Sequence, residues 1–441
     1  MIDSIYLAFL SIINSHNSLL TFILMFTPFV VFFEGPLLLF TIFGLFRFAN
    51  DYLKQDSSLI RLPIVSCCIT CYSEGNSVIN TIKSLTFQTY PGLIEIIAVV
   101  DGAIQNKETL IAVKNCSKFV EGMNMNNRRL VVIPKWQRGG RVSSLNAALK
   151  VAQGEVFMAL DGDTSFDNNM VVNAVKHFND KNVIAVSGNL RVRNASKSLA
   201  TRFQALEYIL SISAGKTGLS AFGIVNNISG AFGIFRKKIL DLVGGWDTGT
   251  AEDFDITTRI KQYFGRNKNW RIVFDPYVVG HTDVPETFLG YFTQRLRWEG
   301  DLFYLIGRKY LDNIKPGLLN WANYFSTVII TYFMQIILPF VITFYTVYLF
   351  YVFPGAYVIA LFFIVYLFYV FVLFIYLLLY VLLISDRLKE DIIYFFYIPL
   401  YPFFAFASRI NAAFAIAHSV LNKSHLDSNM APWWVLRRGR F

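Results

Sequence analysis

The sequence predicts an α/β domain with a mostly parallel sheet, joined to an α-helical transmembrane region. The chain has 441 residues, of which 54% are hydrophobic and only 16% are charged, and this is too apolar for a soluble protein of its length. Long apolar runs lie toward both ends, and between them short β-rich runs alternate with helical patterns. We therefore divide the chain into an N-terminal transmembrane part (1–50), a cytosolic domain with interfacial helices (51–315), and C-terminal transmembrane helices with a basic tail (316–441).

The N-terminal part contains an almost continuous apolar stretch over residues 19–46, interrupted at residues 34–36. About 20 apolar residues are enough to cross a bilayer, so the stretch predicts one span or two. No Lys or Arg precedes Arg47, whereas Arg47, Lys54 and Arg61 follow the stretch. Because basic residues concentrate on the cytoplasmic side of membrane proteins, the domain that follows is predicted to be cytoplasmic.

The cytosolic domain is expected to contain five short strands that alternate with helices, as in βαβ units. The β-rich runs cover residues 64–70, 94–100, 130–133, 156–160 and 183–186. In such sheets, ligands bind at the carboxyl ends of the strands. The polar residues just past the runs are therefore the first candidates for a site: Glu74, Asp101, Lys135, Asp161 and Asp163.

Apolar segments return in the last third of the chain, at residues 324–353, 356–385 and 392–420. Each is long enough to cross a bilayer. The third contains Arg409 and Asn411, so it either crosses and lines a polar cavity or lies partly in the interface. The basic tail at residues 437–440 favours the cytoplasmic side. A further apolar stretch, residues 198–222, is either an interfacial helix or an ordinary buried helix pair.

The net charge of +10 does not indicate nucleic acid binding, because the chain has no compact run of Lys and Arg with interleaved aromatic residues. Cys67, Cys68 and Cys71 fall in an apolar run and its exit. We interpret them as small core residues, not as a disulfide or zinc set. The expected partner surface is a lipid bilayer, and no nucleic acid partner is expected.

Asp161 and Asp163 lie one residue apart, directly after the β-rich run at 156–160. Paired carboxylates at the end of a strand suit a hard divalent cation and the phosphates that it binds. A plain turn is the alternative. Asp101 and Glu74 follow two other runs, and either could hold a nucleoside near the carboxylate pair.

Three further stretches combine residue types that suit a bound sugar nucleotide. Arg141 follows a glycine pair at the start of a helical pattern, where a cation and backbone amides suit a diphosphate, or where a surface turn is solvated. Glu252 and Asp253 belong to an acidic cluster in which one carboxylate could accept a proton from an attacking hydroxyl, unless the cluster only marks a helix N-terminus. Gly230 lies among small residues, where the backbone either passes close to a sugar or makes a packed turn.

Residues 285–301 are predicted to form an amphipathic helix between the two halves of the chain. On a helix, Gln294, Arg297, Trp298 and Asp301 fall on one face, at spacings i, i+3, i+4 and i+7. This face suits charged and ring-shaped ligands, and the opposite, aromatic face suits a membrane boundary.

Taken in order, five of these stretches resemble the processive family 2 glycosyltransferases, the inverting GT-A synthases that include cellulose, chitin, hyaluronan and poly-N-acetylglucosamine synthases. The stretches are residues 71–75, 100–102, 161–163, 252–253 and 294–298, the last of which reads Gln-x-x-Arg-Trp. The resemblance covers roughly residues 62–310, and it implies a cytosolic GT-A domain with a Rossmann-like mixed sheet.

Within this group, two stretches look most like the bacterial poly-β-1,6-N-acetylglucosamine synthases: residues 186–193 and residues 285–287. Two others, residues 100–102 and 229–233, also resemble hyaluronan synthases. The identity of the sugar therefore stays open.

The resemblance implies a role for each matching residue. These roles are uridine contacts for Glu74 and Asp101, phosphate binding for Arg141, a substrate contact for Gly230, binding of UDP and of Mg²⁺ or Mn²⁺ for Asp161 and Asp163, catalysis by Glu252 and Asp253 with Asp253 as the base, and contacts with diphosphate and acceptor for Gln294, Arg297 and Trp298. Three positions depart from the family's pattern, because Arg141, Ala251 and Val100 stand where the family often has Lys, Thr and Asp. The missing hydroxyl beside the base weakens that assignment.

These implications describe an inverting, metal-dependent hexosyltransferase that uses a UDP-sugar donor, with UDP-GlcNAc favoured. It would extend the non-reducing end of a growing β-linked polysaccharide acceptor and export the exopolysaccharide, as in biofilm formation. The expected location is the plasma (inner) membrane with a cytoplasmic catalytic domain, and the resemblance allows a small accessory membrane subunit. The alternatives are a hyaluronan, chitin or cellulose-like synthase with another UDP-sugar, a non-processive glycosyltransferase acting on a lipid carrier, and a transporter with a degenerate sensor domain.

Overall fold

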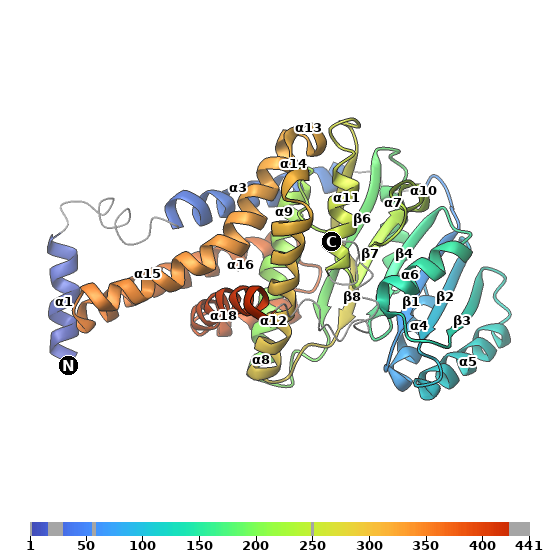
Figure 1. Ribbon diagram of the computed structural model, residues 1–441, viewed down its shortest axis with the longest axis horizontal. Coiled ribbons are helices and arrows are strands. Elements are labelled where there is room, and N and C mark those ends of the chain that lie inside the picture. Colours follow the sequence, from blue (N-terminus) through green and yellow to red (C-terminus); the bar gives the residue numbers. More distant parts are fainter. Residues whose placement is uncertain (1, 16–29, 55–58, 248–250, 423–441) are drawn as a thin grey trace.

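The computed structural model describes residues 2–15, 30–54, 59–247 and 251–422. A sheet with helices on both faces lies at one end of the elongated molecule, and long helices extend away from it (Figure 1). Helix α1 (Ile2–Ser15) lies at the far end, where Ile12 packs beside Leu361 of helix α16 (Gly355–Leu383).

The sheet contains eight strands, in the order β3-β2-β1-β4-β7-β6-β8-β5. They are β1 (Val65–Cys71), β2 (Ile94–Asp101), β3 (Arg128–Lys135), β4 (Val156–Asp161), β5 (Ser165–Phe166), β6 (Val183–Val192), β7 (Phe232–Arg236) and β8 (Arg271–Thr282). The five strands predicted from the sequence are confirmed as β1, β2, β3, β4 and β6. Strands β5, β7 and β8 are not predicted by the β-rich runs.

The strand directions make this a mixed sheet. Strands β3, β2, β1 and β4 are parallel, whereas β7 is antiparallel to both of its neighbours, β4 and β6. Strand β8 runs parallel to β6 and antiparallel to the short β5. The four parallel strands therefore keep their carboxyl ends at one edge, which is where a ligand is expected.

Helices cover both faces of the sheet. Helices α4 (Val78–Thr86), α5 (Lys107–Gly122) and α7 (Met170–His177) cover one face, and α6 (Gly140–Val151), α10 (Lys237–Val243) and α11 (Glu252–Lys261) cover the other. Strand β1 shows why two cores form: Cys67 and Ile69 enter the first core, and Cys68 enters the second. The cysteines are free and buried, as predicted.

The apolar stretch at 198–222 forms one continuous helical segment made of α8 (Leu199–Glu207), the π-helix η3 (Tyr208–Lys216) and α9 (Thr217–Ser220). It is largely buried between the sheet and helix α3 (Gly35–Lys54). At the crossing, a Cβ on Gly44 would lie 2.1 Å from the carbonyl oxygen of Gly218, so the two backbones touch. The segment is therefore a buried helix that carries the sheet against the apolar helices.

Among the described residues, four helical segments are long and apolar enough to cross a membrane: Phe32–Lys54, Trp321–Val352, Gly355–Leu383 and Tyr401–Asn422. Their elements are η1 (Val30–Glu34) with α3, then α14 (Trp321–Ser326), η6 (Thr327–Ile337) and α15 (Leu338–Val352), then α16, and finally α18 (Tyr401–Asn422). Residues 19–29, the first part of the predicted N-terminal apolar stretch, and the basic tail at 437–440 lie outside the described residues. The predicted segment at 392–420 is divided, because the 3₁₀ turn η7 (Ile392–Tyr397) precedes α18.

Short elements complete the part of the chain that the structure describes: η2 (Gly75–Ser77), η4 (Leu305–Lys309), η5 (Leu311–Asn313), α13 (Pro316–Leu319) and α17 (Leu388–Asp391). The amphipathic helix predicted at 285–301 is α12 (Phe288–Tyr304), which runs parallel to α18. Three hydrogen bonds join the two helices, between Tyr291 and Ser408 (2.8 Å), from Asn411 to the carbonyl of Phe292 (3.3 Å) and from Ser419 to the carbonyl of Gly300 (3.3 Å).

Candidate active site

The carboxyl ends of β1, β2 and β4 bring predicted acidic residues to one edge of the sheet. The register pairs Cys71 with Val100 and Thr70 with Asp161, so the loops after these strands leave the sheet side by side. The side chain of Glu74 reaches the loop after β4, where a Cβ on Gly162 would lie 3.1 Å from its Cδ atom.

Asp101 is buried and bonded to its own chain. Its Oδ1 accepts hydrogen bonds from Lys135 Nζ (2.6 Å) and Gly139 N (2.9 Å), and its Oδ2 accepts one from Gly140 N (2.8 Å). The carboxylate thus lies at the N-terminus of α6, where backbone amides favour negative charge. Its visible effect is to hold the glycine turn that precedes Arg141, and the uridine contact stays a prediction.

Arg141 joins the loop after β4 to helix α11. Its guanidinium pairs with Asp161 and with Glu252 Oε1 (2.8 Å), and it donates to the carbonyl of Gly230 (2.5 Å) and to Thr70 Oγ1 (2.7 Å). Burial alone would lower its pKa, but the two carboxylates hold the pKa above its ordinary value. The solvated surface turn that was the alternative for this residue is not what the structure shows.

The side chains of Glu74, Asp161 and Asp163, which we call the carboxylate cluster, lie beside Arg141. Burial raises the pKa of Glu74 to about 6, and Asp163 and Asp161 add to the effect. Burial and Asp161 also raise the pKa of Asp163, and Glu74 Oε2 is buried without a hydrogen-bond partner. Asp161 and Asp163 offer the oxygen ligands that a hard divalent cation prefers, and such a cation would take its other ligands from phosphates and water. Within the described ranges, no cluster of three or more His, Cys, Asp or Glu side chains forms a metal site of its own.

Glu252 and Asp253, which we call the acid pair, begin helix α11. Burial is the main cause that raises the pKa of both carboxyls. Asp253 Oδ2 accepts a hydrogen bond from Asn227 Nδ2 at 3.2 Å. A Cβ on Gly230 would lie 3.2 Å from Glu252 Oε1 and 3.4 Å from Asp253 Cβ, so a glycine here lets the backbone approach the pair. Before the pair, Ala251 has a φ of 47°, which costs an L-residue roughly 1–3 kcal/mol.

The end of α12 and the start of α11 contribute to one apolar cluster. Leu302 of α12 belongs to the cluster against which Phe254 packs, next to the acid pair. Asp301 is buried, and burial raises its pKa to about 7; Arg297 opposes this rise, and the acid pair adds to it. Asp301 therefore lies close enough to the acid pair to be affected by its charge, and Arg297 lies close enough to Asp301 to oppose that effect.

Trp298 is 37% exposed and available as a platform on α12. The guanidinium of Arg295 lies 4.7 Å from the centre of its ring and pairs with Glu207 at 2.5 Å. Gln294 is partly buried on the same helix. Sequence reasoning did not select Arg295, although its spacing of four residues from Glu299, with which it pairs at 4.0 Å, is a helical signal.

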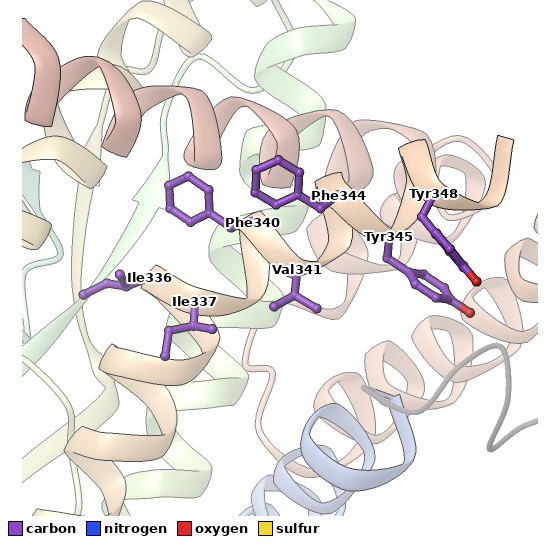
Figure 2. Close-up of a pocket in the computed structure, with 7 residues that line it drawn as sticks. All are labelled: Ile336, Ile337, Phe340, Val341, Phe344, Tyr345 and Tyr348. Atoms are coloured by element: carbon purple, nitrogen blue, oxygen red, sulfur yellow. The ribbon is translucent and has the colours of Figure 1, made fainter. Parts of the chain in front are cut away.

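Two hollows differ in character. A cavity of about 10 Å³, close to the volume for one water, lies behind the acid pair between α6 and α11. A larger, open groove of about 530 Å³ is lined by seven apolar and tyrosine side chains between residues 336 and 348 of η6 and α15 (Figure 2). It contains no acidic or basic side chain, and it lies on a candidate span, so it is not part of the polar site.

The curated proteins that share sequence with this chain include two staphylococcal synthases. A poly-beta-1,6-N-acetyl-D-glucosamine synthase from Staphylococcus aureus is 30% identical over 246 residues, which are 56% of each chain. A synthase of the same name from Staphylococcus epidermidis is 30% identical over 276 residues, which are 62% of each chain. The matches thus span somewhat more than half the length of these curated relatives.

Structural comparison finds the fold in an archaeal enzyme. The mannosyltransferase PcManGT from Pyrobaculum calidifontis, in complex with GDP-Man and Mn²⁺, has a TM-score of 0.53 and 18% identity, over 88% of this chain and 97% of its own. This likeness confirms the predicted GT-A fold, with its Rossmann-like mixed sheet.

Two family models match the chain. The model of glycosyl transferase family 2 covers residues 66–244, and that of glycosyl transferase family group 2 covers residues 156–406, more than half of the chain. The second match includes Asp161, Arg141's partner, as well as the acid pair and α12. The chain therefore belongs to glycosyl transferase family group 2.

Proposed function

We propose that the protein is a processive membrane polysaccharide synthase that uses a UDP-sugar, with UDP-GlcNAc favoured. The observation that carries this proposal is that Asp301 of α12 lies within the electrostatic field of the acid pair, which Arg141 links to the carboxylate cluster at the carboxyl edge of the sheet. One site then combines groups suited to a nucleotide diphosphate with a helix that presents Trp298. The names of the two staphylococcal relatives support poly-N-acetylglucosamine as the product.

In this proposal, Asp253 accepts the proton of the acceptor hydroxyl. The hydroxyl oxygen forms a bond to the anomeric carbon while the bond from that carbon to UDP breaks, so one displacement inverts the configuration. The raised pKa of Asp253 makes it a stronger base than an ordinary carboxylate. Trp298 offers a flat apolar face to the acceptor ring, and Arg297 and Gln294 lie on the same helix for the diphosphate.

Asp161 and Asp163 would hold Mg²⁺ or Mn²⁺, which supplies neutralisation of the charge that develops on the departing diphosphate. The Mn²⁺ bound to PcManGT supports a divalent cation for this fold. Arg141 and Glu74 border the same carboxylates, so both would adjust their contacts when donor binds. The roles of Asp101 with uridine and of Gly230 with the sugar belong to the same proposal.

The proposed location is the plasma (inner) membrane with the catalytic domain in the cytoplasm. The four candidate spans support a membrane protein, and the division at residues 1–50, 51–315 and 316–441 stays a prediction. Export of the growing polymer between the spans, and a small accessory membrane subunit, are further parts of the proposal.

The test is to purify the full chain in detergent and to supply a panel of UDP-sugars with Mg²⁺ or Mn²⁺. UDP release identifies the donor, and the product length on a gel measures processivity. We expect UDP-GlcNAc to give a long polymer. A single added sugar that extracts with lipid would favour the non-processive alternative, and donor binding without UDP release would favour the sensor domain of a transporter.

The assignment of the base has its own test. Asp253→Asn keeps the side chain's size but removes the proton acceptor, and its single amide oxygen can replace only one of the two carboxylate oxygens that accept from Asn227 Nδ2 and Phe254 N. We expect turnover to fall by about 10² to 10⁴, while UDP binding, measured by calorimetry, stays near that of the parent. Polymerisation at the parent rate would show that another group is the base.

A further inference from the structure

A buried lysine lies behind the acid pair. Lys216 is the last residue of the π-helix η3 and is only 8% exposed. Its Nζ donates a hydrogen bond to the carbonyl oxygen of Asn227 at 3.1 Å. π-Helical turns are rare and often occur at functional sites, and burying an ammonium group without a role is costly.

The loop that receives this hydrogen bond also contacts the side chain of Asp253. The Asn227 amide donates to Asp253 Oδ2 at 3.2 Å, so Lys216 and the carboxylate are linked through one residue. The next residue is fixed as well, because Ile228 N donates to Thr257 Oγ1 (3.0 Å), which in turn donates to the carbonyl oxygen of Asp253 (2.6 Å). A displacement of Lys216 would therefore move Asn227 and, through the Asn227 amide, the candidate base.

We propose that Lys216 is a positioning residue for glycosyl transfer: it fixes the backbone of Asn227, so that the Asn227 amide orients Asp253, and its positive charge favours the ionised form of that carboxylate. This proposal rests on the proposed function, since it requires Asp253 to be the base.

The charges around Lys216 agree with this role. Burial lowers its pKa to about 8, and Asp253 opposes the decrease, so the ammonium form persists below that pH. Burial raises the pKa of Asp253, and Lys216 and Arg141 lower it. The other charged groups that face the pair are Glu252, Asp301 on α12, and Lys261, which neighbours Lys216.

Lys261 provides a matched control. It is also a buried lysine, at 3% exposure, and its Nζ donates to the carbonyl oxygen of the preceding loop residue, Asn226, at 3.1 Å. The amide of Asn227, not of Asn226, contacts the base. Removing Lys261 therefore removes a buried charge of the same kind without removing the link to Asp253.

The experiment compares pH profiles of UDP release for Lys216→Met, Lys216→Arg and Lys261→Met. We expect Lys216→Met to lower kcat about tenfold or more, to leave the donor KM unchanged, and to move the acidic limb upward by about one pH unit, because the base loses a favourable charge. Lys216→Arg keeps the positive charge, so its acidic limb should lie at the same pH as that of the parent. Lys261→Met should keep the limb of the parent.

Two more variants make the outcome decisive. Asn227→Ala breaks the link without removing a buried charge, and it should lower kcat and raise the acidic limb as well, even if Lys216→Met fails to fold. If Asp253→Asn is inactive but Lys216→Met and Asn227→Ala keep the parent's pH profile, the role of Lys216 is overturned and the base is not. If Asp253→Asn remains active, the proposed function itself fails at that residue.

Discussion

At the scale of single residues, Arg141 determines how the acidic side chains of the site can lie so close together. Glu252 is buried, and a buried carboxylate is costly unless it is paired. Arg141 pairs with this carboxylate and with Asp161 at the same time. A single guanidinium with a fixed fork of donors can do this, whereas the ammonium of a lysine is a point charge.

Removing this guanidinium should destabilise the protein. We expect Arg141→Ala to lower the free energy of unfolding by about 3–5 kcal/mol, because Glu252 is left buried and unpaired. Since Arg141 lowers the pKa of Glu252, that pKa should rise further in the variant. A raised carboxyl pKa favours the folded state at low pH, so the deficit should shrink as pH falls toward the unfolded pKa of about 4.3.

The measurement is the melting temperature of the detergent-purified variant and parent at pH 5 and pH 8. Arg141→Lys, which keeps a charge, serves as the control and should lose less stability than Arg141→Ala. An equal deficit for Arg141→Ala at both pH values would contradict the assigned pairing with Glu252.

At the scale of elements, helix α12 packs against α18 along its length, and its end shares an apolar cluster with Phe254, the residue next to the acid pair. The close approach to α18 depends on Gly300, where a Cβ would lie 2.9 Å from Ser419 Cβ. At Gly307, farther along the same helical segment, an added Cβ would lie 3.6 Å from the nearest atom, which belongs to the side chain of Phe303. The two glycines therefore differ in the space around them.

This difference gives a prediction with an internal control. We expect Gly300→Ala to push α12 from α18, to cost about 1–3 kcal/mol and to lower UDP release, because Asp301 and Arg297 move with the helix. Gly307→Ala should change neither. The double variant Gly300→Ala, Ser419→Gly should recover activity, since it returns the space; failure to recover would show that packing against α18 is not the cause.

The elements also show what could be predicted from the sequence. Strands β1 to β4 and β6 were predictable because short β-rich runs alternate with helical patterns. Strand β7 begins inside the small-residue stretch around Gly230, whose local signal is that of a turn. The predicted site residues reach one edge because strand ends do, but the pairing of Arg141 with Glu252 joins distant residues and leaves no local signal. The same holds for Lys216, which lies in an apolar helix.

At the scale of the whole molecule, the loop that follows α16 docks on the sheet domain. Arg387 of this loop pairs with Asp167, and Asp391 pairs with Arg191 at the end of β6. The loop and the sheet domain therefore lie on the same side of any membrane that α16 crosses. Chain direction then puts the turn between α15 and α16, near residue 354, on the opposite side.

The docking contact should fix the position of the sheet domain relative to the candidate spans. Asp391 is fully buried, and besides Arg191 it accepts a hydrogen bond from Ser385 Oγ at 2.6 Å. Asp391→Asn leaves Arg191 without its buried charge partner, and only the exposed Glu390 remains, at 3.8 Å; the loss should cost about 3–5 kcal/mol. We expect the loop to become sensitive to limited proteolysis and polymer formation to fall, while UDP binding persists, because the carboxylate cluster and the acid pair lie on other elements of the chain.

Glu390→Gln, whose side chain is 63% exposed, should behave as the parent because exposed ion pairs contribute little. If Asp391→Asn kept both its protease resistance and its polymer yield, the loop would not be what couples the spans to the catalytic domain.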